Sequence, residues 1–491
     1  MGQHSILRTD KYKNVMALAG FPLREETFLF MLRKGGPFIM PVDPKAYVES
    51  CLPTPTEKDY EYLQSQGLVM DPAYRAAMAS GTVQVNGLPK GSWFGDREPV
   101  LTVTGPSALV SFLEPQIIWL QFRIRVATLA RLAPETLSQR LGIVTCERER
   151  EIVLETLETM NVRCDFEIRV ETEEYSTFIG ERAQKLIEIT GDPKRVMEAG
   201  MRAVSCMEQH EVALQACKDS GFCSTSNVYL AQKLGMTPAG TTGHEHTQRW
   251  GSDYAAFSAV RDSYPDEVTF LLDTFSTRHS GLPIAVRAMK ETPDRICSVR
   301  FDSESTMEGD YLLGINMMRE SGFEAPMNLG GGFDIQQTER FETLRQYMNW
   351  PASLQRYMYG QFLVQPHVPL PIRGETGAVF KVSQSGARPT MKFSDNPAKS
   401  SIPGRPVVFR LQHPGSSMNH DRPMSVIGQL DEQPPEGYMV LTGSGRSRPL
   451  EPASLRRFSV HPAVNSPQTE QLIHQLTAER YEQIADAVRK S

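Results

Sequence analysis

Residues 268–273, with the sequence Val-Thr-Phe-Leu-Leu-Asp, form an apolar run that ends in an acid and precedes a helix-like segment at 281–290. The same plan returns at 296–319, where the apolar run ends at Asp302, and again at 325–348, where it ends in three glycines. Strands, loops and helices that alternate in this way predict a parallel sheet, either open or closed into a barrel. In such folds the polar residues that follow the strands line the active site.

The flanking sequence divides the chain into three parts. Residues 1–134 mix helix and strand patterns. Residues 135–370 carry the repeated units. They begin with an insertion-like, charge-rich stretch at 135–195, for which a solvated face is expected. Residues 371–491 are β-rich and punctuated by proline, and they close with an amphipathic helix that begins at the capping pair Ser466-Pro467. We therefore expect an α/β protein with a separate antiparallel layer near the end of the sequence.

The composition is that of an ordinary globular protein. The 491 residues are 40% hydrophobic and 22% charged, with a formal net charge of -6. Because there is no basic surplus, nucleic-acid binding is not expected as the main function. The strongest apolar stretch, 109–122, is interrupted by Glu114-Pro115, so no membrane span is expected. The seven cysteines lack a repeated C-x-x-C pair, which argues against a disulfide framework and favours a cytoplasmic protein.

Residues 243–251 place His244, Glu245 and His246 between glycines, in what reads as a loop. Histidines at i and i+2 point to the same side of an extended chain but do not share a helix face. Three roles stay open: a zinc site, for which the sequence offers no third ligand, a structural histidine, and an imidazole that accepts a phosphoryl group. The third role depends on the neighbouring residues.

Those neighbours are charged side chains and glycines at the ends of the predicted strands. Arg202 and Arg300 lie in apolar surroundings, where a guanidinium needs a carboxylate, phosphate or aromatic partner, although a structural ion pair would also satisfy it. Asp273 and Asp302 could hold Mg²⁺ through water or bind ribose hydroxyls, or could simply cap helices. The glycines at 330–332 let backbone N–H groups approach an anion. Together these residue types suit a sugar-phosphate ligand with a divalent cation.

A series of short motifs is spread in order over most of the chain. They are T-D-x-Y at 9–12, an arginine-bearing turn at 200–203, S-N-V at 226–228, G-T followed by the histidines at 240–247, D-T-F-S and S-G-L-P at 273–283, and V-R-x-D-S at 299–303. These motifs resemble those of the nicotinate phosphoribosyltransferases and, more distantly, the nicotinamide phosphoribosyltransferases. The resemblance implies an irregular, TIM-like α/β barrel with an α/β sandwich domain that the N-terminal and C-terminal parts build together. It also implies a homodimer with shared active sites.

The resemblance gives a role to each candidate residue. His246 would be phosphorylated by ATP and form the catalytic set with Asp273 and Arg300, while His244 would support it. Tyr12 would stack on the pyridine across the dimer interface. The other implied contacts are Asp273 with Mg²⁺ and diphosphate, Arg202 and Arg300 with base and phosphate, Asp302 with ribose, Ser226, Asn227 and Ser303 with substrate, and Gly330, Gly331, Gly332 and Gly360 with phosphate groups.

Some positions depart from the family pattern. Ala203 replaces a second arginine and Ala199 a bulky residue, so the base pocket is expected to be wider or to bind a different ligand. Glu304 adds an acid near a phosphate region, and the second phosphate loop has only Gly360. The stretch 135–195 is longer than the usual connection in the family. Three roles stay open for it: an oligomer contact, a regulatory element or simply an insertion.

The leading hypothesis is an enzyme that forms nicotinate mononucleotide and diphosphate from nicotinate and phosphoribosyl diphosphate, with Mg²⁺ and with ATP coupling through a phosphohistidine. The first alternative is nicotinamide or another planar base as acceptor in the same fold. The second is a catalytically degenerate paralogue that binds a nucleotide, to which Glu304 and the altered loop at Gly360 point. The expected partners are these small molecules and a second copy of the chain, without nucleic acid or membrane.

Overall fold

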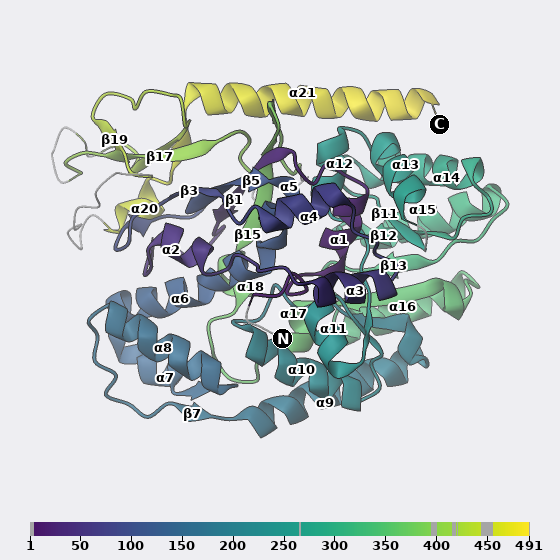
Figure 1. Ribbon diagram of the computed structural model, residues 1–491, viewed down its shortest axis with the longest axis horizontal. Helices are drawn as coiled ribbons and strands as arrows, with labels where there is room; N and C mark the ends of the chain where they lie inside the picture. Colours follow the sequence, from purple (N-terminus) through teal and green to yellow (C-terminus); the bar gives the residue numbers. More distant parts are fainter. Residues whose placement is uncertain are drawn as a thin grey trace.

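The computed structural model describes residues 4–264, 267–393, 400–414, 419, 421–442 and 455–490. Its largest sheet has seven parallel strands in the order β10-β9-β8-β14-β13-β12-β11. Figure 1 labels three of them, β11, β12 and β13. The parallel sheet that the repeated units predict is therefore present. Its strands are β8 (Val196–Glu198), β9 (Ser224–Thr225), β10 (Thr237–Pro238), β11 (Val268–Leu271), β12 (Cys297–Phe301), β13 (Met327–Leu329) and β14 (Gln355–Tyr359).

The order of the strands leaves one opening in this sheet. The first strand in the sequence, β8, pairs with the second, β9, and with the last, β14. The first and the last strand of the sheet are therefore neighbours, as in a barrel. Within the described part of the chain, β10 and β11 are edge strands that share no ladder. A side-chain hydrogen bond from Thr242 Oγ1 to the carbonyl oxygen of Thr269, at 3.2 Å, spans the opening. The sheet is thus a parallel half-barrel, and the irregular, TIM-like barrel with a sandwich domain that the resemblance implies stays a prediction.

Helices follow the parallel strands and cover the sheet. The amphipathic pattern of α14 shows why, because Leu282, Ala285, Val286 and Met289 at positions i, i+3, i+4 and i+7 are all buried. The sequence of elements therefore matches the repeated units at 268–348. These helices are α10 (Met207–Asp219), α11 (Val228–Leu234), α12 (His244–Trp250), α13 (Asp253–Ser263), α14 (Leu282–Glu291), α15 (Met307–Glu320) and α16 (Ile335–Tyr347).

A five-stranded antiparallel sheet combines strands from the two ends of the sequence. Its order is β16-β15-β1-β5-β3, and Phe28 of β1 is paired with Val103 on one side and Val382 on the other. The strands are β1 (Glu25–Met31), β3 (Gln84–Gly87), β5 (Leu101–Pro106), β15 (Val379–Ser385) and β16 (Arg388–Pro389). The helices of the same part are α1 (Lys11–Leu18), α2 (Pro44–Glu49), α3 (Glu57–Ser65), α4 (Pro72–Ala79), α5 (Ser107–Phe112) and α6 (Glu114–Leu132).

The charge-rich stretch 135–195 is more than a solvated face. It forms α7 (Leu137–Leu141), α8 (Glu147–Thr159) and α9 (Thr172–Thr190), with the two short parallel strands β6 (Ile143–Val144) and β7 (Arg169–Val170). Val153 and Leu157 of α8 are buried in one apolar cluster with Phe122 and Val126 of α6. Most charges of α8 therefore lie on its outer side, but Glu149 is buried, where it accepts hydrogen bonds from Thr145 and Ser205.

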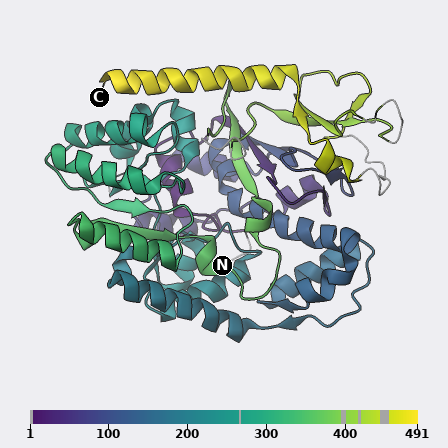
Figure 2. The same ribbon diagram turned by 180° about the vertical axis from the view of Figure 1, so that it is seen from behind.

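The last part of the chain forms a four-stranded sheet and a long helix. The sheet, in the order β19-β17-β18-β20, consists of β17 (Pro406–Leu411), β18 (Ser425–Gln429), β19 (Tyr438–Val440) and β20 (Val464–Asn465). The predicted helix is α21 (Pro467–Lys490), which runs along one side of the molecule in both ribbon views (Figures 1 and 2). Ser466 Oγ accepts a hydrogen bond from the Thr469 backbone N–H at 3.2 Å, as the capping prediction requires. Among the described helices, none combines the length and apolar character that crossing a membrane demands.

One buried ion pair connects the five-stranded sheet with helix α12, which follows the parallel strand β10. Arg249 of α12 donates hydrogen bonds of 2.9 Å from Nε and Nη2 to the two carboxylate oxygens of Glu26 on β1, and both side chains are buried. We expect Arg249→Met to lower the free energy of unfolding by about 3–5 kcal/mol, because it leaves a buried carboxylate unpaired. Denaturant unfolding measures this change. Glu49→Gln, which removes an exposed pair with Lys45, is the control, and an equal loss in both variants would contradict the prediction.

Candidate active site

Several parallel strands end at residues that the sequence singled out. Asp302 directly follows β12, Gly330 follows β13 and Gly360 follows β14, whereas Asp273 lies two residues beyond β11. A cavity of about 560 Å³ lies at these strand ends. The predicted residues that line it are Tyr12, Arg202, His244, Arg300, Asp302, Gly330, Gly331, Gly332 and Gly360. The C-terminal edge of the sheet therefore brings these candidates together, as in other parallel α/β folds.

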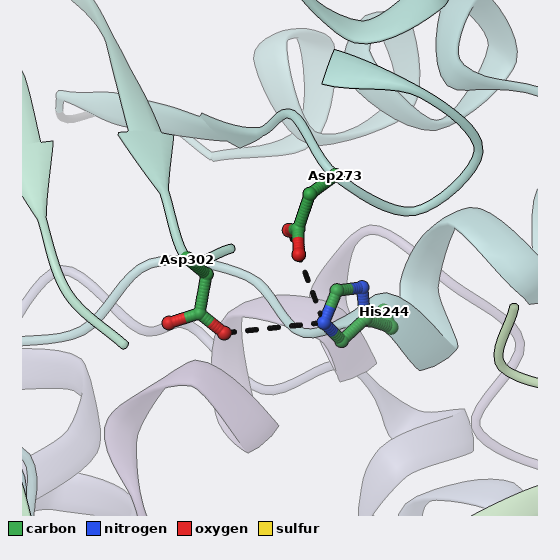
Figure 3. Close-up of side chains that lie close together, drawn as sticks. All are labelled: His244, Asp273 and Asp302. Carbon is green, nitrogen blue, oxygen red and sulfur yellow. Dashed lines mark ion pairs between the residues drawn. The ribbon is translucent and has the colours of Figure 1, made fainter. Parts of the chain in front are cut away.

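His244 lies between two carboxylates at the edge of this cavity (Figure 3). Its Nε2 atom is 3.9 Å from Asp273 Oδ1 and 4.0 Å from Asp302 Oδ2, and its Nδ1 atom is 3.2 Å from Thr274 Oγ1. Neither His244 Nε2 nor Asp273 Oδ1 has a hydrogen-bond partner among the described residues, although both atoms are buried. Burial, together with the nearby cation Lys392, holds the pKa of His244 well below its usual value, so the ring is neutral at pH 7.

The stretch around the histidines is a helix and not the expected loop. α12 starts at His244, with Gly243 at its N-cap and Gly251 in the left-handed conformation at its C-cap. On a helix, residues i and i+2 point in different directions. His246 accordingly does not line the cavity. Its Nε2 atom is 2.9 Å from the carbonyl oxygen of Ala256, and burial lowers its pKa to about 4.

A second group of charges in the cavity surrounds Glu114 at the start of α6. Lys13 Nζ is 2.7 Å from Glu114 Oε2, and Arg202 Nη1 is 3.3 Å from Oε1. Burial alone would raise the pKa of Glu114, but Lys13, Lys381 and Arg202 together hold it well below its usual value. The hydroxyl of Tyr12 also donates to Glu114, and the Arg202 guanidinium is 5.7 Å from the Tyr12 ring centre. One chain therefore supplies both Tyr12 and Arg202 to one cavity. The stacking of Tyr12 across a dimer interface, which the resemblance implies, stays a prediction.

The glycines after β13 are required by a close approach of two strand ends. Gly331 has a φ of +84°, and a Cβ at this position would lie 2.5 Å from the carbonyl oxygen of Asp302. Any larger residue would displace Asp302, which also accepts a hydrogen bond of 2.8 Å from Arg300 Nη2. Arg300 Nη1 in turn donates to Thr241 Oγ1 at 3.0 Å. These contacts fix Asp302 and Arg300 relative to one another.

The remaining predicted residues lie outside the cavity lining. Ser303 Oγ donates to Asp273 Oδ2 at 2.8 Å, so it orients that carboxylate. Ser226 Oγ donates to Asp10 Oδ1 at 2.5 Å, and the Asn227 side chain caps α11 by accepting from the Leu230 backbone N–H at 3.0 Å. These contacts give Ser226 and Asn227 a supporting role behind the site.

The cavity contains several cations that the sequence analysis did not single out. Its described lining includes six cationic side chains, Arg33, Arg202, Arg300, Arg373, Lys381 and Lys392, and four carboxylates, Glu114, Glu245, Asp302 and Asp334. This surplus of positive charge favours an anionic ligand. Lys381 lies on β15, where it interrupts the apolar run at 378–382, and this lysine was the available signal. Burial lowers the pKa of Lys381 to about 7, although the negative charge of Glu114 acts to raise it.

The long helix α21 contacts the loop that carries Asp273. Arg480 donates from Nε at 2.9 Å and from Nη2 at 2.6 Å to the carbonyl oxygen of Phe275. Its guanidinium also lies 5.4 Å from the ring centre of Phe393, next to Lys392 of the cavity. Arg480 thus connects two segments that supply residues to the site.

The donor set around His244 fits Mg²⁺ held by carboxylate and water oxygens. Single ligand atoms of His244, Asp273 and Asp302 all lie within 4.8 Å of one another. Mg²⁺ prefers oxygen ligands and keeps several waters, so the two carboxylates suit it better than the imidazole does. The buried Asp273 Oδ1, which has no partner among the described residues, is consistent with such a ligand.

The fold and the site together define an α/β protein with a cationic cavity, a buried histidine and two carboxylates at the ends of parallel strands. No known family model matches the chain. The nicotinate phosphoribosyltransferase of Bacillus subtilis is 29% identical over 269 residues, which are 53% of this chain and 51% of that protein. The nicotinate phosphoribosyltransferase of Bos taurus is 25% identical over 333 residues, or 57% of this chain and 60% of that protein. The chain is therefore related to the nicotinate phosphoribosyltransferases.

A solved structure supports the same fold. The nicotinate phosphoribosyltransferase structure from Porphyromonas gingivalis superposes with a TM-score of 0.56 at 18% identity, and the match covers 81% of this chain and 96% of that one. At this identity the likeness concerns the fold. The sequence matches themselves span only between half and two thirds of the length of the two relatives named above.

Proposed function

We propose that this protein is an enzyme that transfers a phosphoribosyl group from phosphoribosyl diphosphate to nicotinate, and that it couples the transfer to ATP through a phosphohistidine at His244. The observation that carries the proposal is the position of His244 Nε2, which is buried, faces the cavity and lies about equally far from Asp273 and Asp302. His246 was the expected acceptor, but its contacts direct it away from the cavity. We therefore assign the role to His244.

In the transfer, the base nitrogen forms a bond to the anomeric carbon while the bond from that carbon to the diphosphate oxygen breaks. Arg300, Lys381 and Lys392 are the cavity cations that would hold the anionic groups, because charge-assisted hydrogen bonds are strongest in a site shielded from water. Asp273, oriented by Ser303, would hold Mg²⁺, whose chemistry here is to neutralise the diphosphate. Asp302, fixed by Arg300, would accept hydrogen bonds from the ribose hydroxyls.

In the coupling step, His244 Nε2 attacks the γ-phosphorus of ATP. A nitrogen–phosphorus bond forms, the bond from phosphorus to the bridging oxygen breaks, and ADP leaves with the electron pair. The depressed pKa of His244 favours this step because the unprotonated nitrogen is the nucleophile. A proton on Nδ1, donated to Thr274 Oγ1, would leave the Nε2 lone pair directed towards the cavity.

A panel of bases tests the proposed function. Diphosphate release is measured with nicotinate, nicotinamide and other planar nitrogen bases, each with and without ATP. We expect turnover with nicotinate and stimulation of that turnover by ATP. If every base is inert, the protein is not this enzyme, and a preference for nicotinamide would change the assigned acceptor. Ala199 and Ala203 both line the cavity, so bulkier bases belong in the panel.

The ionisation of Lys381 predicts a pH dependence of substrate binding. With a pKa of about 7, Lys381 is charged at pH 6 and largely neutral at pH 8.5, and Glu114, Arg202, Lys392 and Lys13 are the charges around it. We expect the KM for the anionic substrates to rise about tenfold over this range, because a hydrogen bond to a charged group contributes about 1.5–3 kcal/mol. Lys381→Arg should keep the KM low and flat. An unchanged rise in Lys381→Met would contradict the prediction.

Arg480 is predicted to be a positioning residue for Asp273. Arg480→Met keeps the packing on Phe393 but removes both hydrogen bonds to Phe275. We expect kcat/KM for phosphoribosyl diphosphate to fall about tenfold to a hundredfold and the Mg²⁺ requirement to rise, with the KM for nicotinate unchanged. Glu479→Gln, which removes an exposed pair with Arg388, is the matched control on the same helix. A uniform loss of all kinetic parameters would indicate a merely structural role.

A further inference from the structure

A second cavity, of about 370 Å³, lies behind the wall of the first. Glu114 of α6 and Arg202 line the first cavity, whereas Gln116 and Trp119 of α6, with Ser205 and Cys206, line the second. Helix α6 and the turn before α10 are therefore shared walls. The indole Nε1–H of Trp119 on α6 donates to the carbonyl oxygen of Met201 at 2.9 Å and so connects α6 with the turn before α10.

The second cavity has positive charge on its walls. Arg8, Arg123 and Arg148 line it, and Glu208 is the one carboxylate in its described lining. Arg123 and Arg148 both pair with Glu155, at 2.7 and 3.0 Å, and Arg148 also pairs with Glu151 at 2.6 Å. Both carboxylates are about half exposed, at 47% and 56%, and lie outside the lining. A phosphate inside the cavity could therefore contact both guanidinium groups without displacing a buried acid.

The first turn of α10 is also part of this wall. Cys206 is its N-cap and provides no capping hydrogen bond, and Cys206, Met207 and Glu208 all line the cavity. The first backbone N–H groups of a helix have no intrahelical partner, and the helix dipole places positive potential at that end. A helix start beside arginines is suited to a phosphate group.

Gln116 supplies the independent observation that points to a ligand. Its side chain is 7% exposed, and Nε2 donates to the carbonyl oxygen of Arg8 at 2.6 Å, which fixes the orientation of the amide. Gln116 Oε1 is then a buried acceptor without a hydrogen-bond partner among the described residues. A buried acceptor of this kind is costly unless a donor occupies it, so the missing group is an N–H or O–H.

We propose that this second cavity binds a nucleoside monophosphate. Its phosphate contacts Arg123, Arg148 and the start of α10, a hydroxyl or amino group donates to Gln116 Oε1, and the flat base lies against Trp119. The volume is within the range of small-molecule sites, and the combination of aromatic wall, fixed acceptor and cations matches the three parts of a nucleotide. The site does not depend on the function proposed for the first cavity.

The test uses AMP and inorganic phosphate as probes with the full chain. Calorimetry gives the affinity for each probe, and the fluorescence of Trp119 reports binding at this cavity. Trp119→Phe should lose the fluorescence change on binding but keep the heat of binding. We expect AMP to bind more tightly than phosphate and Arg148→Glu to weaken AMP at least tenfold. Arg150→Glu, on the same helix but outside the lining, should change the affinity less than about twofold.

Gln116→Leu provides a second test that leaves the charges in place. It should reduce the advantage of AMP over phosphate and leave phosphate binding unchanged. The proposal is overturned if AMP produces no change in Trp119, if Arg148→Glu and Arg150→Glu behave alike, or if phosphate alone binds as well as AMP. None of these outcomes depends on phosphoribosyl transfer, so failure here leaves the function of the first cavity untouched.

Discussion

Replacing His244 by alanine is expected to abolish the stimulation of turnover by ATP and to lower kcat by about a hundredfold to ten-thousandfold, the usual contribution of a positioned histidine. The reason is geometric, since Nε2 of this residue is the imidazole nitrogen that faces the cavity between Asp273 and Asp302. The measurements are diphosphate release with and without ATP, and acid-labile phosphate on the protein after incubation with ATP.

His246→Ala is the matched control on the same helix. The His246 ring is neutral and hydrogen-bonded to the carbonyl oxygen of Ala256. Removing the ring should lower the free energy of unfolding, while the folded variant keeps the coupling of turnover to ATP. Labelled phosphate should remain in His246→Ala and disappear in His244→Ala. The opposite pattern would restore the original assignment of the phosphohistidine to His246.

Asp273→Asn is expected to lower kcat/KM for phosphoribosyl diphosphate by about a hundredfold to a thousandfold, in line with the removal of one preorganised electrostatic group. The substitution keeps the size of the side chain and its contact with Ser303 but removes the charge that would hold Mg²⁺. The expected signature is a higher Mg²⁺ concentration at half-maximal rate with an unchanged KM for nicotinate.

The control for Asp273→Asn is Asp262→Asn, because Asp262 is exposed and distant from the cavity lining. That variant should keep the activity and Mg²⁺ dependence of the unaltered protein. If Asp273→Asn has the same Mg²⁺ dependence as Asp262→Asn, the carboxylate of Asp273 does not hold the cation.

The strand ends could be predicted from the sequence because the signal is local. At 268–348, apolar runs of strand length stop at a polar residue or glycine before each helix, and parallel pairing places all these stops on one edge. Asp302 and Gly330 therefore meet without any long-range information. The opening between β10 and β11 could not be predicted from a local sequence pattern, because it depends on how far the whole sheet curves.

The helix at His244 could not be predicted in the same way. Its seven residues lie between glycines, and contacts far along the chain hold it in place: Lys13 donates to Glu245 at 2.9 Å, and Arg249 pairs with Glu26. Short helices depend on tertiary packing more than on propensity. The change from loop to helix is what separates His244 from His246. The contact of Tyr12 and Lys13 with Glu114 was hidden for a related reason, since Glu114 lies in a distant segment that only the fold brings close.

The central position of β1 has a consequence for how the protein matures. Because β1 pairs with β5 on one side and β15 on the other, its second neighbour is synthesised long after the first. Lys381, a wall residue of the cavity, arrives with that late strand. During translation all strands of the parallel sheet are therefore synthesised before β15, which supplies one side of the ligand cavity. Competence to bind substrate should therefore appear only after β15 has been synthesised and has paired with β1, and pairings so distant in sequence make this closing step slow.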